Sequence, residues 1–126
     1  MNVDRLIEAH VRDQSRESFL ALNKAIIEAE FALPVSGHIS KINSNHYDVP
    51  VLCIKTDRGG AIPAFTTEAH LLAWKPEGSN YAMLRGRALL EMAKEMREIS
   101  EIVINIQAGP SGRIPRADFD GILSLS

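Results

Sequence analysis

Two short runs rich in β-forming residues flank a turn sequence, and this arrangement constrains the fold more than any other feature of the chain. The runs are Val51 to Thr56 and Ala61 to Phe65, and the residues between them are Asp57-Arg58-Gly59-Gly60. Aspartate and glycine are typical of tight turns, because glycine tolerates a positive φ. The pattern predicts a β-hairpin, so the middle of the chain contains an antiparallel pair of strands.

Apolar residues recur at helical spacing in two runs near the start of the chain. The first extends from Val3 to Val11 and the second from Phe19 to Ala29. This period predicts two amphipathic helices, each with one apolar face that has to lie against something. A short polar residue, Asp13 or Ser15, is expected to cap the second helix.

Extended periodicity follows the second helix. Phe31, Leu33 and Val35 are apolar at alternate positions, which predicts a strand, and Pro34 favours an edge position or the end of that strand. From Gly37 to Asp48 the sequence is polar and lacks a clear period. We expect an exposed loop with little structure there.

The part of the chain after the hairpin alternates between helical and extended patterns. Thr66 or Thr67 can cap a helix that continues to Trp74, and a strand is predicted from Tyr81 to Leu84. A helix is predicted over residues 87–97, and Ile102 to Ile106 is typical of a central buried strand.

The last residues predict a loop and then a helix. Ala108 to Arg113 is rich in turn residues, and Pro115 suits the first position of a final short helix. Taken together, the pattern predicts an α+β fold of one domain, residues 1–126. We expect a mixed, mostly antiparallel sheet of about four to five strands covered by helices.

Composition excludes several classes of function. The 126 residues are 45% hydrophobic and 24% charged, with 14 basic and 16 acidic side chains and a formal net charge of -2. This balance is ordinary for one globular domain and argues against binding to a phosphate backbone. No apolar stretch is long enough to span a membrane, and the acidic start differs from a secretory signal. We therefore expect a cytoplasmic protein without nucleic-acid or membrane partners.

The single cysteine, Cys53, stands in the apolar run Val51-Leu52-Cys53-Ile54. No internal disulfide can form from one cysteine, which agrees with a reducing compartment. We expect Cys53 to be a buried packing residue, with a reactive thiol as the alternative.

Patterns that would indicate catalysis or a cofactor are missing. The four histidines, His10, His38, His46 and His70, lack the i, i+4 spacing of two metal ligands on one helix. Ser111 lies in Gly109-Pro110-Ser111-Gly112, which is neither a nucleophile elbow nor a phosphate loop. The sequence predicts no metal, no cofactor and no catalytic residue.

One predicted helix starts with an unfavourable charge pattern. Arg85-Gly86-Arg87 puts two cations at the start of a predicted helix, where the helix dipole already disfavours positive charge. Two guanidinium groups and free helix amides could together bind a small anion or a partner's carboxylate, with Thr66, Thr67 or Asn105 adding polar contacts. In the alternative interpretation, Arg87 simply pairs with Glu91 one turn further on.

Two further candidates are apolar. Trp74, Tyr81 and Phe65 are expected to cluster beside the helix that follows Thr67, either as core or as one wall of a ligand pocket. An open sheet whose edges are marked by Pro34 and Pro63 can also offer a strand or a helix face to another subunit.

Several of these motifs together resemble the N-terminal domain of the SseB, or enhanced serine sensitivity, family of bacteria. The matching features are a strand ending in Leu33-Pro34-Val35, a hairpin entering Pro63-Ala64-Phe65-Thr66, Trp74 soon after, a glycine before a leucine-rich helix (Gly86 to Met92), and the buried strand around Ile104-Asn105-Ile106. The Asn-Pro pair expected after that strand is missing. The likeness covers roughly residues 15–123 and implies that the C-terminal domain of full-length members is absent.

The resemblance implies no catalytic residues, because the family has no established catalytic residues that could be matched to this sequence. Together with the missing motifs, it predicts a non-catalytic protein-interaction or regulatory module whose partner is another protein or a second copy, as in a homodimer. The alternative is a domain that binds, and possibly hydrolyses, a small anionic metabolite at Arg85 and Arg87.

Overall fold

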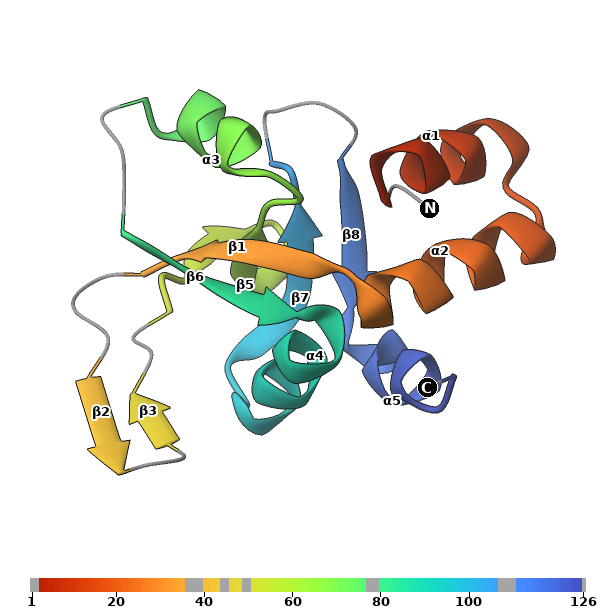
Figure 1. The fold of residues 1–126 in the computed structure, drawn as a ribbon. Coiled ribbons are helices and arrows are strands. Elements are labelled where there is room, and N and C mark those ends of the chain that lie inside the picture. Colours follow the sequence, from red (N-terminus) through yellow and green to blue (C-terminus); the bar gives the residue numbers. More distant parts are fainter. Residues whose placement is uncertain are drawn as a thin grey trace.

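A computed structural model of the chain describes residues 3–35, 40–43, 46–48, 51–76, 80–106 and 111–125. Figure 1 shows the arrangement of its elements. In chain order they are α1 (Val3–Asp13), α2 (Arg16–Glu28), β1 (Glu30–Pro34), β2 (Ser40–Asn43), β3 (His46–Asp48), β4 (Ile54–Thr56), β5 (Gly59–Ala64), α3 (Glu68–Trp74), β6 (Tyr81–Arg85), α4 (Gly86–Glu95), β7 (Ile99–Ile104), β8 (Gly112–Pro115), a 3-10 turn (Arg116–Asp118) and α5 (Phe119–Leu123).

The main sheet has four strands in the order β4-β5-β7-β8. β4 with β5 and β7 with β8 are antiparallel pairs, whereas β5 and β7 are parallel, since the chain crosses between them through α3, β6 and α4. A second, two-stranded sheet pairs β1 with β6, and a bridge from Ala32 to Phe65 joins it to the end of β5. The predicted α+β class with a mixed, mostly antiparallel sheet is confirmed.

The predicted hairpin is present with a shorter first strand. β4 and β5 pair so that Thr56 lies opposite Gly59, with Asp57 and Arg58 between them. Gly59 has a φ of 120°, a conformation that side chains with a Cβ rarely adopt. The glycine therefore fixes the turn, as the sequence indicated.

The helix caps follow from the local sequence. Ser15 accepts the N–H of Ser18, and the Ser18 hydroxyl oxygen accepts the N–H of Ser15, which together form a capping box at the start of α2. Thr67 caps α3 by accepting the N–H of His70. Of the two predicted caps at each helix, the structure uses Ser15 and Thr67.

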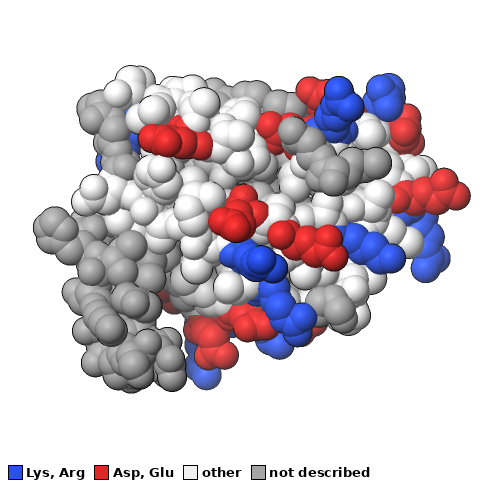
Figure 2. All heavy atoms as spheres, in the orientation of Figure 1, with Lys and Arg blue, Asp and Glu red and all other residues white. Residues whose placement is uncertain are grey.

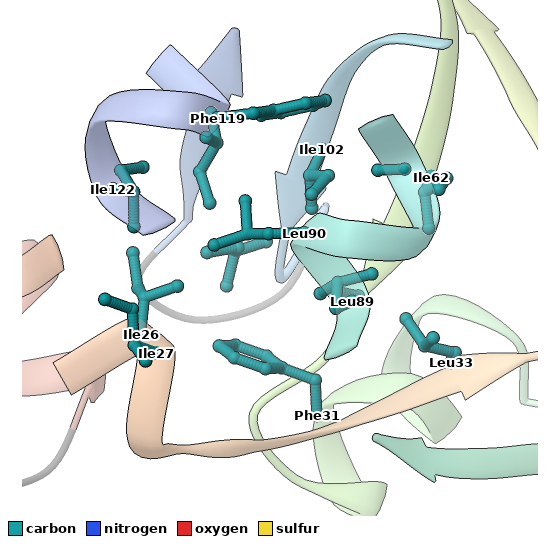
Figure 3. Close-up of a cluster of buried hydrophobic side chains, with 14 of the residues drawn as sticks. Ile26, Ile27, Phe31, Leu33, Ile62, Leu89, Leu90, Ile102, Phe119 and Ile122 are labelled. Carbon is teal, nitrogen blue, oxygen red and sulfur yellow. The ribbon is translucent and has the colours of Figure 1, made fainter. Parts of the chain in front are cut away.

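The hydrophobic core lies between the sheets and the helices α2, α4 and α5. Figure 3 shows Ile26 and Ile27 of α2, Phe31 of β1, Leu90 of α4 and Phe119 of α5 converging on one volume. Phe31, Ala32 and Leu33 are all fully buried, so both faces of β1 are covered. A strand that is covered on both faces has an almost continuous apolar sequence. The alternation of Phe31, Ala32 and Leu33 is one of side-chain size, because Ala32 is small but as fully buried as its neighbours.

Two segments predicted as loops contain strands. The polar stretch from Gly37 to Asp48 includes β2 and β3, which pair as an antiparallel hairpin with a register shift between Lys41 and Asn43. Its expected lack of structure is therefore wrong for the described residues. In the turn-rich segment from Ala108 to Arg113, the described residues Gly112 and Arg113 belong to β8, which pairs with β7. The three strands β2, β3 and β8 are too short to produce a period in the sequence.

Candidate functional site

The ends of the parallel strands β5 and β7 bring together polar side chains from distant parts of the chain. Asn105, which follows β7, is fully buried, and its Oδ1 accepts the N–H of Thr66 at 3.0 Å. Its Nδ2 donates to Oδ1 of Asp4 at 3.0 Å and to Oγ1 of Thr66 at 3.1 Å. The carboxyl ends of parallel strands are where α/β proteins place ligands, so this cluster is a candidate site by position.

Asn105 adopts a φ of 55°, which is the left-handed region that favours glycine and asparagine. Thr66 also donates its hydroxyl to Oδ1 of Asp4 at 2.7 Å. Asp4 lies in the first turn of α1, so these bonds tie the N-terminal helix to the sheet. The predicted polar residues Thr66 and Asn105 are brought together, and Asp4 is a member that the sequence did not reveal.

His70 extends the cluster outward to Thr67. Its Nδ1 lies within hydrogen-bonding distance of Oγ1 of Thr67, and its Nε2 is 3.6 Å from Oδ2 of Asp4. The order hydroxyl, imidazole, carboxylate is that of a nucleophilic triad. However, 3.6 Å is too long for a hydrogen bond, and the Thr67 hydroxyl already serves as the cap of α3. These contacts are better explained as holding α1 and α3 against the sheet than as a catalytic site.

The aromatic residues singled out in the sequence form a small second core beside this cluster. Phe65 and Trp74 stack with ring centroids 5.5 Å apart, and Tyr81 packs against the buried Phe65 and Leu71. The Tyr81 hydroxyl donates a hydrogen bond to the Glu68 carboxylate, and this bond, together with the negative charge of Glu68, raises the pKa of Tyr81. These contacts join α3 to β6 and correspond to the core-packing interpretation of Trp74.

The arginines at the start of α4 lie in a different place. The N–H of Gly86 donates to the carbonyl of Ala29 at 2.8 Å, so the positive end of α4 meets the carbonyl end of α2. Nε of Arg87 is 3.2 Å from Oε1 of Glu91, as in the simple pairing interpretation. In Figure 1, α4 starts below β1 whereas α3 lies above it. The structure therefore does not bring Arg85 and Arg87 to Thr66, Thr67 and Asn105.

The main sheet contains an ion pair with a buried carboxylate, which the sequence did not predict. Glu101 of β7 is fully buried, accepts a short hydrogen bond from the Thr56 hydroxyl, and lies 2.9 Å from Nε of Arg113. Arg113 also donates to Asp57 at 2.7 Å, and this hydrogen bond, with the arginine's charge, lowers the pKa of Asp57. Only the pairing of β4, β5, β7 and β8 places these groups together, so no local pattern could have revealed them.

The expectation of a buried Cys53 is wrong, because the residue is exposed. It precedes β4 and lies outside the paired part of the hairpin, so the apolar run around it does not enter the core as a strand. Partial shielding of the sulfur and the nearby charge of Glu98 raise the pKa of the Cys53 thiol. A raised pKa reduces the thiolate fraction, which opposes the reactive alternative.

Charges of both signs are interspersed on the face that Figure 2 shows, and the described residues there form no continuous basic surface. Within the described residues, no group of three or more metal-ligating side chains is close enough to hold an ion. None of the helices in the described part is long and apolar enough to cross a membrane. Of the four histidines, His38 lies outside the described residues.

Comparison with known proteins gives one match. The family model of the SseB protein N-terminal domain matches residues 3–118, which is most of the chain. Searches of curated proteins and of solved structures give no match. The matched range includes α1, and hence Asp4 of the polar cluster, and ends just before α5. The chain therefore belongs to the SseB family and corresponds to the N-terminal domain of that family.

Proposed function

We infer that this domain is a non-catalytic protein-interaction module that binds an extended segment of a partner along the outer edge of β6. The partner is a second copy of the chain or another protein. The observation that carries this proposal is the open edge of β6: among the described residues, β1 is the only strand that pairs with it.

The register identifies which backbone groups are available. The N–H and C=O of Ala32 both bond to Phe65, so they point away from β6. Met83 lies directly opposite Ala32, and in an antiparallel pair of this type both residues direct their backbone groups outward. Tyr81 and Arg85 follow the same alternation. β6 thus presents the N–H and C=O groups of Tyr81 and Met83 and the N–H of Arg85 at its free edge, because the C=O of Arg85 caps the first turn of α4.

The side chains of β6 leave that edge accessible. Ala82 is buried and Leu84 packs against the core, while Met83 is 50% exposed. Natural proteins protect edge strands with proline, inward-pointing charge or a central lysine. β6, with the sequence Tyr-Ala-Met-Leu-Arg, carries a charge only at its end. An unprotected edge of five residues is the arrangement used in binding by strand addition.

A charged substitution at the centre of the edge tests the proposal. A tagged copy is isolated from its native cell as wild type, Met83→Lys and Leu72→Lys. Leu72 is a matched control because it is also a large exposed apolar residue, 41% exposed, but lies on α3. We expect wild type and Leu72→Lys to recover the same associated chain, and Met83→Lys to recover about tenfold less.

Two results contradict the proposal. If wild type recovers neither a second copy nor another protein in stoichiometric amount, the domain does not act by stable protein binding. If all three forms recover the partner equally, binding uses another surface and β6 is not the site.

A further inference from the structure

A hollow between α1, α2, β8 and α5 is lined by a polar side chain that makes no hydrogen bond to a described residue. Three polar side chains are buried among the described residues, namely Asn23, Glu101 and Asn105. Asn105 and Glu101 have the partners given above. Asn23 is only 5% exposed, and its side chain makes no hydrogen bond to any described residue. Neither polar atom of its amide is among the fully enclosed atoms without a partner, so the amide is open to the hollows that it lines.

Asn23 lines two adjoining hollows. The first has a volume of about 90 Å³ and the second about 180 Å³, and they share Phe19, Asn23, Asp118 and Ile122 as walls. The remaining walls are mainly apolar, with Ile7, Leu22 and Ile26 in the first hollow. Apolar cavities of about 150 Å³ hold a molecule of the size of benzene. The second hollow is therefore large enough for a ligand of that size, and both hollows are too small for a typical cofactor.

The polar groups around the hollows define the chemistry of the ligand. Asp118 forms no ion pair or side-chain hydrogen bond with a described residue and supplies a carboxylate acceptor. The Asn23 amide supplies one further acceptor and one donor group. Nδ1 of His10 is occupied by the Ser18 hydroxyl at 2.8 Å, and the guanidinium of Arg113 is occupied by Asp57 and Glu101. The available groups are mainly acceptors, so a matching ligand has to bring a donor.

We propose that the hollow at Asn23 is a binding site for a small molecule with an apolar body about as large as a benzene ring and a hydrogen-bond donor at one end. An alcohol, a phenol and a primary ammonium share this chemistry. The apolar body lies in the second hollow, against Phe19 and Ile122, and the donor end contacts Asn23 and Asp118. The site is separate from the β6 edge and does not depend on the function proposed for it.

Four simple compounds test the ligand chemistry. Phenol, n-pentylamine, toluene and benzoate are titrated into ¹⁵N-labelled protein while the side-chain amide resonances of Asn23 are followed. We expect phenol and n-pentylamine to shift these resonances saturably. Toluene, which lacks a donor, should bind about tenfold more weakly, and benzoate should be the weakest because of repulsion by Asp118. Tighter binding of phenol than of n-pentylamine identifies a neutral donor, and the reverse identifies a cation.

A pair of substitutions on α2 provides the control. Asn23→Leu replaces the unpartnered amide with an apolar side chain and should leave the protein folded, since it removes a buried polar group. Lys24→Leu makes the same change one residue further on, at an exposed position outside these two hollows. We expect Asn23→Leu to reduce phenol binding to the level of toluene, and Lys24→Leu to bind as wild type does. No saturable shift with any compound, or equal phenol binding by both variants, would overturn the proposal.

Discussion

A single guanidinium group, that of Arg116, satisfies the carbonyl groups at the end of α4. Its Nη1 donates to Met96 at 2.9 Å and to Ile99 at 2.7 Å, with a longer bond to Ala93, and its Nη2 donates to Lys94 at 2.6 Å. The last carbonyls of a helix have no partner within the helix. Arg116 supplies those partners and at the same time holds the start of β7 in place.

Arg116→Lys tests this role, because lysine keeps the charge but lacks the planar fork of donors. We expect the substitution to lower the free energy of unfolding by about 2–4 kcal/mol, since several carbonyl groups lose a charged donor. Chemical denaturation of the two proteins measures the difference. A loss below about 0.5 kcal/mol would show that water replaces these bonds without cost.

The Asp57–Arg113 contact makes a small part of the stability depend on pH. The pKa of Asp57 is lowered in the folded protein, so its carboxylate stabilises the fold above its unfolded pKa, near 3.8. This stabilisation is lost as the pH falls through the lower, folded value. We therefore expect wild type to be more stable than Asp57→Asn at neutral pH, and the difference to shrink as the pH falls below about 4 and to disappear below the folded pKa of Asp57. A difference in melting temperature that stays constant from pH 7 to pH 3 would contradict this assignment.

At the scale of single residues, local chemistry was predictable and distant partners were not. Thr67 as a cap and Gly59 in the turn follow from rules that act within a few residues. The bond between Asn105 and Asp4 joins residues 101 positions apart, and that between Thr66 and Asp4 joins residues 62 apart. Such contacts depend on how α1 packs against the sheet, which the sequence pattern does not specify.

At the scale of elements, α4 approaches α2 so closely at Gly86 that there is no room for a side chain. A Cβ built on Gly86 would lie 1.6 Å from the carbonyl oxygen of Ile26, which no side chain permits. In the sequence, Gly86 stood out only as a helix start between two arginines and as part of the family pattern. Glycine is required at position 86 because the backbones of α2 and α4 are in direct contact there.

Two alanine substitutions separate this contact from ordinary helix propensity. We expect Gly86→Ala to lower the free energy of unfolding by about 3 kcal/mol or more, because the helices must move apart. Gly121→Ala, in α5, is the control, since nothing lies within 4 Å of its added Cβ. It should raise stability by about 0.5–1 kcal/mol. Thermal unfolding of both variants gives the comparison, and equal effects would refute the close packing of α2 and α4.

Elements with a long or clear period were predicted correctly, whereas the short strands β2, β3 and β8 were not. The helices α1, α2 and α4 each repeat an apolar position over several turns, so their sequences indicate them directly. β8 has four residues, of which only Ile114 is buried, and it exists because β7 offers its edge to it. β2 and β3 likewise depend on each other, and neither run carries an apolar pattern.

At the scale of the whole molecule, the sequence established the class of fold and the family, and the structure adds two separate surfaces. Of the site residues predicted together, Thr66, Thr67 and Asn105 lie in one cluster that fastens α1 and α3, while Arg85 and Arg87 lie at the start of α4. The open edge of β6 is visible only in the register, because a strand's free side depends on which neighbours it has. This edge is the surface at which we propose that a partner binds.

Site-specific photo-crosslinking along β6 tests that claim most directly. The photoreactive amino acid p-benzoylphenylalanine is placed at position 83 in one protein and at position 72 in a control, both of which hold exposed apolar side chains. After irradiation in the native cell, the account predicts a discrete adduct from position 83 and none from position 72. Its mass then distinguishes a second copy from another protein. No adduct at position 83, or equal adducts at both positions, would contradict the account.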